Sequence, residues 1–124
     1  MLQLDSSALV GALCGQRPAI PELQRWLDEG EPVFLSAPVL YEWQRGPRRP
    51  EELKIQEDLF PSSLAIPFGP TEAAIAAKLY RTIKRPRARA FDLTIAACAI
   101  SYNARLWTLH PQDFSDIPNL VLAK

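Results

Sequence analysis

The sequence has little of what zinc-binding, disulfide-linked or membrane-spanning proteins need. Of its 124 residues only two are cysteine and one is histidine, which excludes a zinc site of the usual four-ligand kind. Cys14 and Cys98 lie among apolar neighbours, so we expect two buried, reduced thiols rather than a disulfide. No segment approaches the roughly 18 apolar residues of a membrane-spanning helix. The start of the chain lacks the basic region of a signal peptide. We therefore expect a cytoplasmic protein with no membrane contact.

An excess of charge of either sign is also absent. Fourteen Lys and Arg balance fourteen Asp and Glu, and 48% of the residues are apolar. This composition excludes disorder caused by weak hydrophobicity or high net charge. It also argues against a protein that coats nucleic acid with a uniformly basic surface. The length predicts one domain spanning residues 1–124.

Proline, with twelve residues, separates segments whose hydrophobic periods differ. The pattern predicts strands at 2–4, 33–35, 64–66, 105–108 and 120–122. It predicts helices at 6–13, 20–29, 37–45, 51–60, 71–84 and 92–103, the last apolar almost all round and so buried. Alternating strands and helices predict an α/β fold with a parallel sheet covered on both faces.

Four acidic residues follow or begin these predicted elements. Asp5 directly follows the first strand, and Asp113 lies in the loop after the strand at 105–108. Glu42 lies on the helix after the second strand, and Asp92 begins the buried helix. Since ligands of open α/β sheets bind beyond the carboxyl ends of the strands, we expect these acids to meet at one end of the sheet.

Each acid also has an ordinary structural explanation. Asp5 and Asp92 stand where helix caps stand, Glu42 fits a solvated helix residue, and Asp113 fits a loop or a short turn. Brought together, however, carboxylates repel one another and hold protons unless a cation intervenes. Oxygen ligands favour Mg²⁺ or Mn²⁺, and such an ion activates water and neutralises phosphoryl oxygens. The four acids thus indicate metal-dependent hydrolysis of a phosphate ester.

Four blocks of the sequence, in order, resemble those of PIN domains. Residues 4–10 (LDSSALV) resemble the opening LDTSxLV, and residues 36–42 resemble S-x-x-V-x-x-E. Residues 92–97 resemble D-x-x-I-A-A, and residues 108–114 resemble T-x-N-x-x-D-F. The blocks span almost the whole chain at family-like intervals. The length further resembles the toxins of bacterial and archaeal toxin–antitoxin pairs, the VapC type.

The resemblance implies a three-layer α/β/α sandwich with a central parallel sheet of four or five strands. It implies a Mg²⁺- or Mn²⁺-dependent endoribonuclease that acts on RNA, with a cognate antitoxin and a homodimer as partners. Ser7 matches a hydroxyl that supports the first acid, and Thr108 a polar residue beside the last. His110 stands where Asn is common, either as a ligand of water or RNA or as a neutral substitution. The catalytic and metal-binding positions are Asp5, Glu42, Asp92 and Asp113.

One segment concentrates positive charge. Residues 78–89 carry six basic side chains and no acidic ones, and the run leads directly to Asp92. Phosphate contacts give affinity without sequence information. The residues expected to contact RNA are Lys84, Arg85, Arg87 and Arg89. A second basic rim is expected beyond Glu42, at Arg45, Arg48 and Arg49.

Other α/β classes fit less well. A haloacid dehalogenase-type phosphatase needs Asp-x-Asp after its first strand, but Ser7 occupies the third position. A response-regulator receiver needs an acidic pair after that strand and a late Lys, and neither is present. The remaining alternative is an inactive PIN-like module that works only by binding proteins. The candidates for contact with an antitoxin helix, with core packing as the alternative for each, are Trp26, Leu27, Trp43, Leu59 and Phe60.

Overall fold

The central strand of the sheet is β1 (Leu2–Leu4), all three of whose residues are buried. A computed structural model describes residues 1–15 and 19–123. In order, its elements are β1, α1 (Ser6–Leu13), α2 (Ala19–Asp28), β2 (Val33–Phe34), α3 (Ala37–Arg45), α4 (Pro50–Leu59), η1 (Ser62–Leu64), α5 (Pro70–Thr82), η2 (Pro86–Arg89), α6 (Ala90–Ser101), β3 (Arg105–Trp107), η3 (Pro111–Asp113) and β4 (Val121–Leu122), where η denotes a 3₁₀ helix.

The described strands form one parallel sheet in the order β2-β1-β3-β4. The chain leaves β1 toward β2, then passes back beyond β1 to form β3 and β4. The direction of the connections therefore reverses between β1 and β3, where Leu4 pairs with Trp107. In open α/β sheets this reversal opens a crevice at the carboxyl ends of the strands. The predicted parallel sheet, with four strands, is confirmed.

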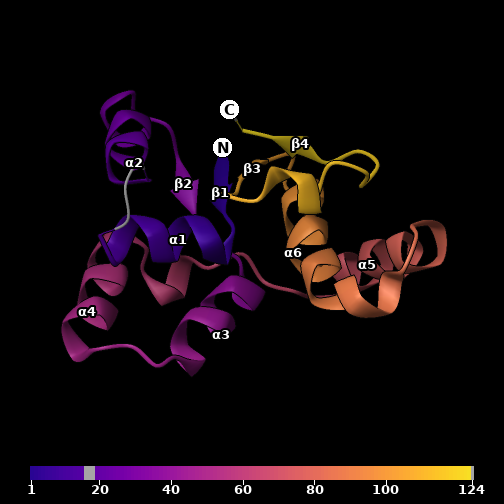
Figure 1. Ribbon diagram of the computed structural model, residues 1–124, viewed down its shortest axis with the longest axis horizontal. Coiled ribbons are helices and arrows are strands. Elements are labelled where there is room, and N and C mark those ends of the chain that lie inside the picture. Colours follow the sequence, from indigo (N-terminus) through magenta and orange to yellow (C-terminus); the bar gives the residue numbers. More distant parts are fainter. Residues whose placement is uncertain (16–18, 124) are drawn as a thin grey trace.

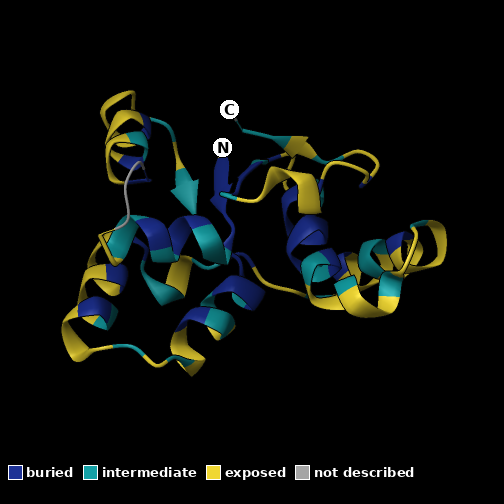
Figure 2. Cartoon of the chain, viewed as in Figure 1, coloured by how far each residue is buried: buried dark blue, intermediate teal, exposed yellow. Residues whose placement is uncertain are grey.

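The helices lie on both sides of β1. Figure 1 shows α1 to α4 on one side and α5 and α6 on the other. Helix α1 packs against α2 and α3, and α5 packs against α6. Six of the twelve residues of α6 are buried, five of them in the run 95–99, so the predicted buried helix is confirmed, as Figure 2 shows. The inner strands β1 and β3 are largely buried, whereas β2 is half-buried and Val121 of β4 is 58% exposed.

One predicted strand, at 64–66, is wrong. The segment Ser62–Leu64 forms η1, and only Ile66 makes an isolated bridge, to Ser36. The Glu57 carboxylate accepts hydrogen bonds from the N–H and hydroxyl of Ser62, at 3.1 and 2.6 Å. These contacts favour a turn after α4, and Pro67 cannot donate a backbone hydrogen bond to a sheet.

The prediction for the cysteines is half right. Cys98 is a buried free thiol, but Cys14 is exposed. It lies one residue past the end of α1, where the chain turns away from the core, and its thiol donates to Glu52 Oε2 at 3.1 Å. Within the described ranges, no helix is long and apolar enough to cross a membrane.

Candidate active site

The crevice between β1 and β3 contains the first predicted acid. The Asp5 N–H donates to the Trp107 carbonyl at 2.8 Å, so Asp5 lies beside the end of β3. Its Oδ2 accepts hydrogen bonds from Ser7 Oγ at 3.1 Å and from Thr108 Oγ1 at 2.8 Å. Asp5 is only 7% exposed. Two hydroxyl donors therefore fix the position of one carboxylate oxygen, Oδ2.

The same hydroxyls hold the loop after β3. The Leu109 N–H donates to Ser7 Oγ at 3.0 Å, and the His110 N–H donates to Thr108 Oγ1 at 3.1 Å. The predicted supporting residues Ser7 and Thr108 thus join the ends of two strands about a hundred residues apart. His110 contributes its backbone N–H here, and its side chain is exposed.

Glu42 reaches the site from α3. The Ser6 hydroxyl donates to Glu42 Oε1, and Arg45 Nη2 lies 3.9 Å from Oε2. The Ser36 side chain caps α3 by accepting from the Val39 N–H at 3.4 Å, which sets the start of this helix. Ser6 was not among the predicted site residues. Its position between Asp5 and Ser7 was the available signal for a second hydroxyl at the site.

Asp92 is half-buried in the first turn of α6. Burial, together with the smaller effects of the negative charges of Asp5, Glu42 and Asp113, raises the pKa of its carboxyl from 3.8 to about 6. Arg89 acts in the opposite direction. Since these charges act on one group, the structure brings all four predicted acids to the same end of the sheet.

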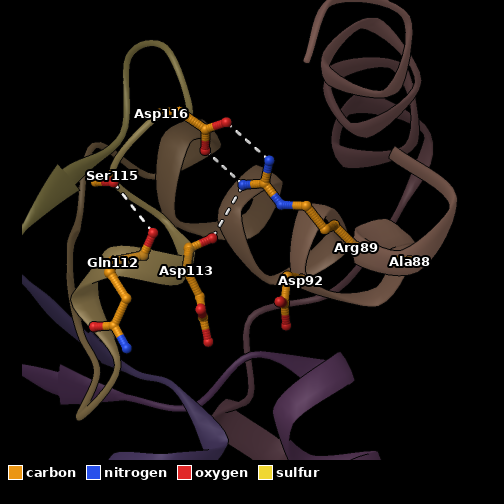
Figure 3. A pocket seen from close by; sticks show the side chains of 7 residues that line it. All are labelled: Ala88, Arg89, Asp92, Gln112, Asp113, Ser115 and Asp116. Atoms are coloured by element: carbon orange, nitrogen blue, oxygen red, sulfur yellow. Dashed lines mark hydrogen bonds and ion pairs between the residues drawn. The ribbon is translucent and has the colours of Figure 1, made fainter. Parts of the chain in front are cut away.

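Asp113 ends η3, beside an open cleft. A cleft of about 570 Å³ is lined by Ala88, Arg89, Asp92, Gln112, Asp113, Ser115 and Asp116. In Figure 3 the Asp92 and Asp113 carboxylates point the same way, toward the N-terminal part of the chain. The Arg89 guanidinium turns away from them, toward Asp116.

Arg89 joins η2 to the loop that carries Asp113. Its two terminal nitrogens donate to Asp116 Oδ2 at 2.8 Å and Oδ1 at 2.6 Å, and Nη2 also donates to the Asp113 carbonyl at 3.0 Å. Bidentate pairs of this kind are among the stronger hydrogen bonds in proteins. The arginine holds the pKa of Asp116 below its ordinary value. The sequence analysis missed Asp116, whose only signal was its position three residues after Asp113.

The family model for the PIN domain matches residues 3–119.

The chain belongs to the PIN domain family.

A "Ribonuclease VapC" of Rickettsia bellii is 42% identical over 57 residues, which cover 44% of this PIN domain and 42% of that protein. The match thus spans less than half of that relative's length. Two solved structures resemble nearly the whole chain. VapBC2 from Rickettsia felis, bound to a promoter DNA fragment, has a TM-score of 0.76 at 24% identity, covering 98% of this chain and 96% of that one. A toxin–antitoxin complex from Klebsiella pneumoniae has a TM-score of 0.74 at 21% identity, with the same coverage. These likenesses confirm the fold.

The donor set of this PIN domain suits a divalent cation. Four carboxylates supply oxygen ligands only, which match Mg²⁺ or Mn²⁺. The raised pKa of Asp92 shows that the acids repel one another when no cation offsets their charge. Among the described residues, no group of three or more His, Cys, Asp or Glu side chains is arranged so that it could hold a metal ion. Two oxygens are already bound by hydroxyls, Asp5 Oδ2 by Ser7 and Thr108 and Glu42 Oε1 by Ser6.

The predicted RNA-contact residues differ in their surroundings. Lys84, Arg85 and Arg87 are exposed, and Arg85 adopts a left-handed backbone conformation directly before η2. Arg89 is committed to Asp116 and to the Asp113 carbonyl. At the cleft, Arg89 therefore links η2 to the loop after η3 by hydrogen bonds (the Arg89 brace).

The residues expected to contact an antitoxin are divided between core and surface. Trp26, Trp43 and Phe60 are at most 5% exposed, so they are core residues in the PIN domain. Leu27 and Leu59 are exposed. Of these five candidates, only Leu27 and Leu59 are placed for direct contact with a partner. The three buried rings belong to the hydrophobic core, as large apolar side chains usually do.

Proposed function

We propose that this PIN domain is a metal-dependent endoribonuclease that hydrolyses phosphodiester bonds of RNA. The observation that carries the proposal is the shared electrostatic environment of Asp5, Glu42, Asp92 and Asp113. These residues come from four separate segments, and folding alone would favour keeping such like charges apart. Their gathering at the switch point of the sheet is explained if they bind a cation together.

Each acid has a part in the proposed reaction. Asp5, Glu42 and Asp92 would hold one divalent ion, and Asp113 would help hold a second ion or position the attacking water. When bound, the ion lowers the pKa of water and neutralises charge on the phosphoryl oxygens. Ser7 and Thr108 orient Asp5, and Ser6 orients Glu42.

The exposed acid, Asp113, lies where water enters the cleft. There its carboxylate can hold a water molecule in line with the phosphorus. The Arg89 brace fixes the backbone of this acid and so the direction of its side chain. The products would carry a 5′-phosphate and a 3′-hydroxyl.

The test is cleavage of RNA by the purified protein with Mg²⁺ or Mn²⁺. We expect cutting with either ion, none in EDTA, and a loss of at least about a hundredfold in Asp5→Asn and Asp92→Asn, as expected when transition-state charge stabilisation is lost. Asp58→Asn is the matched control, because Asp58 is exposed and paired with Lys54 on α4. Cutting that survives EDTA or both site variants would disprove the mechanism.

We further propose that the protein is the toxin of a type II toxin–antitoxin pair, acting in the cytoplasm as a homodimer. The support is the likeness to the Rickettsia bellii ribonuclease and to the two toxin–antitoxin structures. A small DNA-binding protein encoded beside this chain is expected. Co-expression with that neighbour should suppress RNA cleavage and yield a stable complex on gel filtration.

An inactive PIN-like binding module is the alternative function. Calorimetric titration with Mn²⁺ separates the two, because a module that binds only proteins needs no cation site. We expect saturable Mn²⁺ binding that Asp92→Asn weakens and Asp58→Asn leaves unchanged. Absence of Mn²⁺ binding in the unmodified protein would favour the binding module.

A further inference from the structure

Two exposed aromatic side chains stand directly beside the acids. Tyr41 precedes Glu42 on α3, and Phe91 precedes Asp92 on α6. Their ring centroids are 5.9 Å apart, and the ring planes are tilted by 47°. Tyr41 is 56% exposed and Phe91 37%. Residues fifty positions apart in the sequence thus form one ring pair at the rim of the acid cluster.

Core packing does not account for this pair. Neither ring belongs to the buried hydrophobic cluster of the described residues or to the half-buried side chains packed against it. Exposed rings keep much of their apolar area in water, so the pair gains little of the stabilisation that buried aromatics give. A ligand with a flat apolar face would cover this area.

A positive charge accompanies the rings. The Arg45 guanidinium lies 5.6 Å from the Tyr41 ring centroid, one helical turn further along α3. It also lies 3.9 Å from Glu42 Oε2, in an ion pair whose arginine side chain is 59% exposed. Exposed ion pairs are weak, so this guanidinium can exchange its carboxylate contact for a phosphate. Aromatic rings beside arginine are the combination that binds unpaired nucleotides.

We propose that Tyr41 and Phe91 form a stacking surface for an unpaired base of the RNA, with Arg45 on an adjoining phosphate. The inference rests on the proposed endoribonuclease function and adds a base-binding subsite to it. Consecutive helical side chains diverge by about 100°, so the rings lie beside the acids and the base stays clear of the carboxylates. Since a paired base has its faces covered by its neighbours, the surface selects an unpaired one.

The experiment measures binding of a short single-stranded RNA in EDTA, where no cleavage is expected. The RNA carries the fluorescent base 2-aminopurine at one position, which is moved along the strand in successive probes. In the unmodified protein we expect quenching at one position only. We expect Tyr41→Ala and Phe91→Ala each to weaken binding by about tenfold and to abolish the quenching. Tyr41→Phe keeps the ring and should keep both.

Tyr102→Ala is the matched control. Tyr102 is 41% exposed and caps the opposite end of α6 from Phe91. It should leave affinity and quenching unchanged, and thermal melting should show that every variant is folded. Unchanged RNA binding in Tyr41→Ala and Phe91→Ala would overturn the proposal. If these two variants instead lost binding of a co-expressed antitoxin, the rings would be a protein contact, which also overturns it.

Failure of the stacking surface and failure of the proposed nuclease function give different results. If RNA binding depends on the two rings but the protein does not cut RNA in Mn²⁺, the nuclease function is contradicted and the stacking surface is supported. RNA cut normally by Tyr41→Ala and Phe91→Ala, with unchanged affinity, would contradict the stacking surface and leave the nuclease standing.

Discussion

At the scale of single residues, Asp92 is the group on which the site depends most. It is half-buried at the start of α6, and three other acids act on it. A helix N-terminus favours a carboxylate, but here burial and like charge outweigh that effect and raise the pKa to about 6. The residue therefore costs stability when it is ionised and no cation is present.

The pH dependence of Asp92→Asn tests this. The unfolded chain loses the Asp92 proton near its ordinary pKa of 3.8 and the folded chain near 6. The folded state thus binds more protons between these values, and its contribution to stability falls as pH rises from about 4 to about 6. The shift of about two pKa units corresponds to about 3 kcal/mol, which solvent screening of the half-buried side chain reduces. In EDTA at pH 7 we therefore expect Asp92→Asn to be more stable by roughly 1–3 kcal/mol and to lose this part of the pH slope.

Urea unfolding at a series of pH values is the measurement, with Asp58→Asn as control. Adding Mn²⁺ should reverse the order, because a bound ion stabilises the unmodified protein by mass action. A less stable Asp92→Asn variant at pH 7 without metal would contradict the assignment.

Thr108 gives a second prediction at this scale. Its buried hydroxyl donates to Asp5 and accepts from the His110 N–H. Thr108→Val keeps the shape but removes the acceptor of the His110 N–H and one of the two hydroxyl donors to Asp5 Oδ2, leaving Ser7 as the other. The change should cost about 1–3 kcal/mol in unfolding free energy and weaken Mn²⁺ binding. Thr82→Val is the control, since that hydroxyl bonds only carbonyls of its own helix. Equal losses in the two variants would contradict a special role for Thr108.

At the scale of elements, short segments around the sheet decide the shape of the site. Hydrophobic periods predicted the helices and most strands, because each period reports which face is buried. They failed at 64–66, where a Glu57 carboxylate and neighbouring prolines formed a turn instead. The 3₁₀ segments η2 and η3 carry no period at all, yet they hold Arg89 and Asp113.

The Arg89 brace between η2 and the η3 loop is testable. Asp116→Asn and Arg89→Lys both remove the bidentate pair, and lysine does not reproduce the fork. We expect either change to lower kcat about tenfold while KM changes little, because Asp113 loses its fixed direction. Asp28→Asn, an exposed acid on α2 bonded to Gln24, should leave kcat unchanged. A rise in KM alone would indicate that Arg89 binds RNA directly.

At the scale of the whole molecule, the zero net charge is the sum of a basic segment and an acidic remainder. Residues 78–89 carry six basic groups, which leaves eight basic and fourteen acidic groups on the rest of the chain. Four of those acids lie at the site, where a cation would offset their charge. The zero net charge therefore excludes a uniformly basic RNA-binding surface, but it is compatible with local RNA contact by the basic residues of 78–89, here called the RNA track.

The salt dependence of RNA binding tests the track. Each lost phosphate contact lowers the slope of log affinity against log salt by about 0.7 on a single strand. We expect the exposed pair Lys84→Ala/Arg87→Ala to flatten the slope by roughly twice that amount. Lys54→Ala on α4, whose partner is Asp58, should not change it. An unchanged slope in the pair would remove both residues from the RNA contact.

The sequence by itself determined the kind of sheet and the buried helix, and it predicted the four acids of the proposed site. These follow from local patterns, since periodicity and residue type report burial and donor chemistry without long-range information. Only the tertiary structure decided that Ser6 holds Glu42, that Arg89 braces Asp116 and that Tyr41 meets Phe91. Each of these contacts joins residues 27 to 50 positions apart, and no local pattern specifies which distant partner the folded chain places beside a side chain.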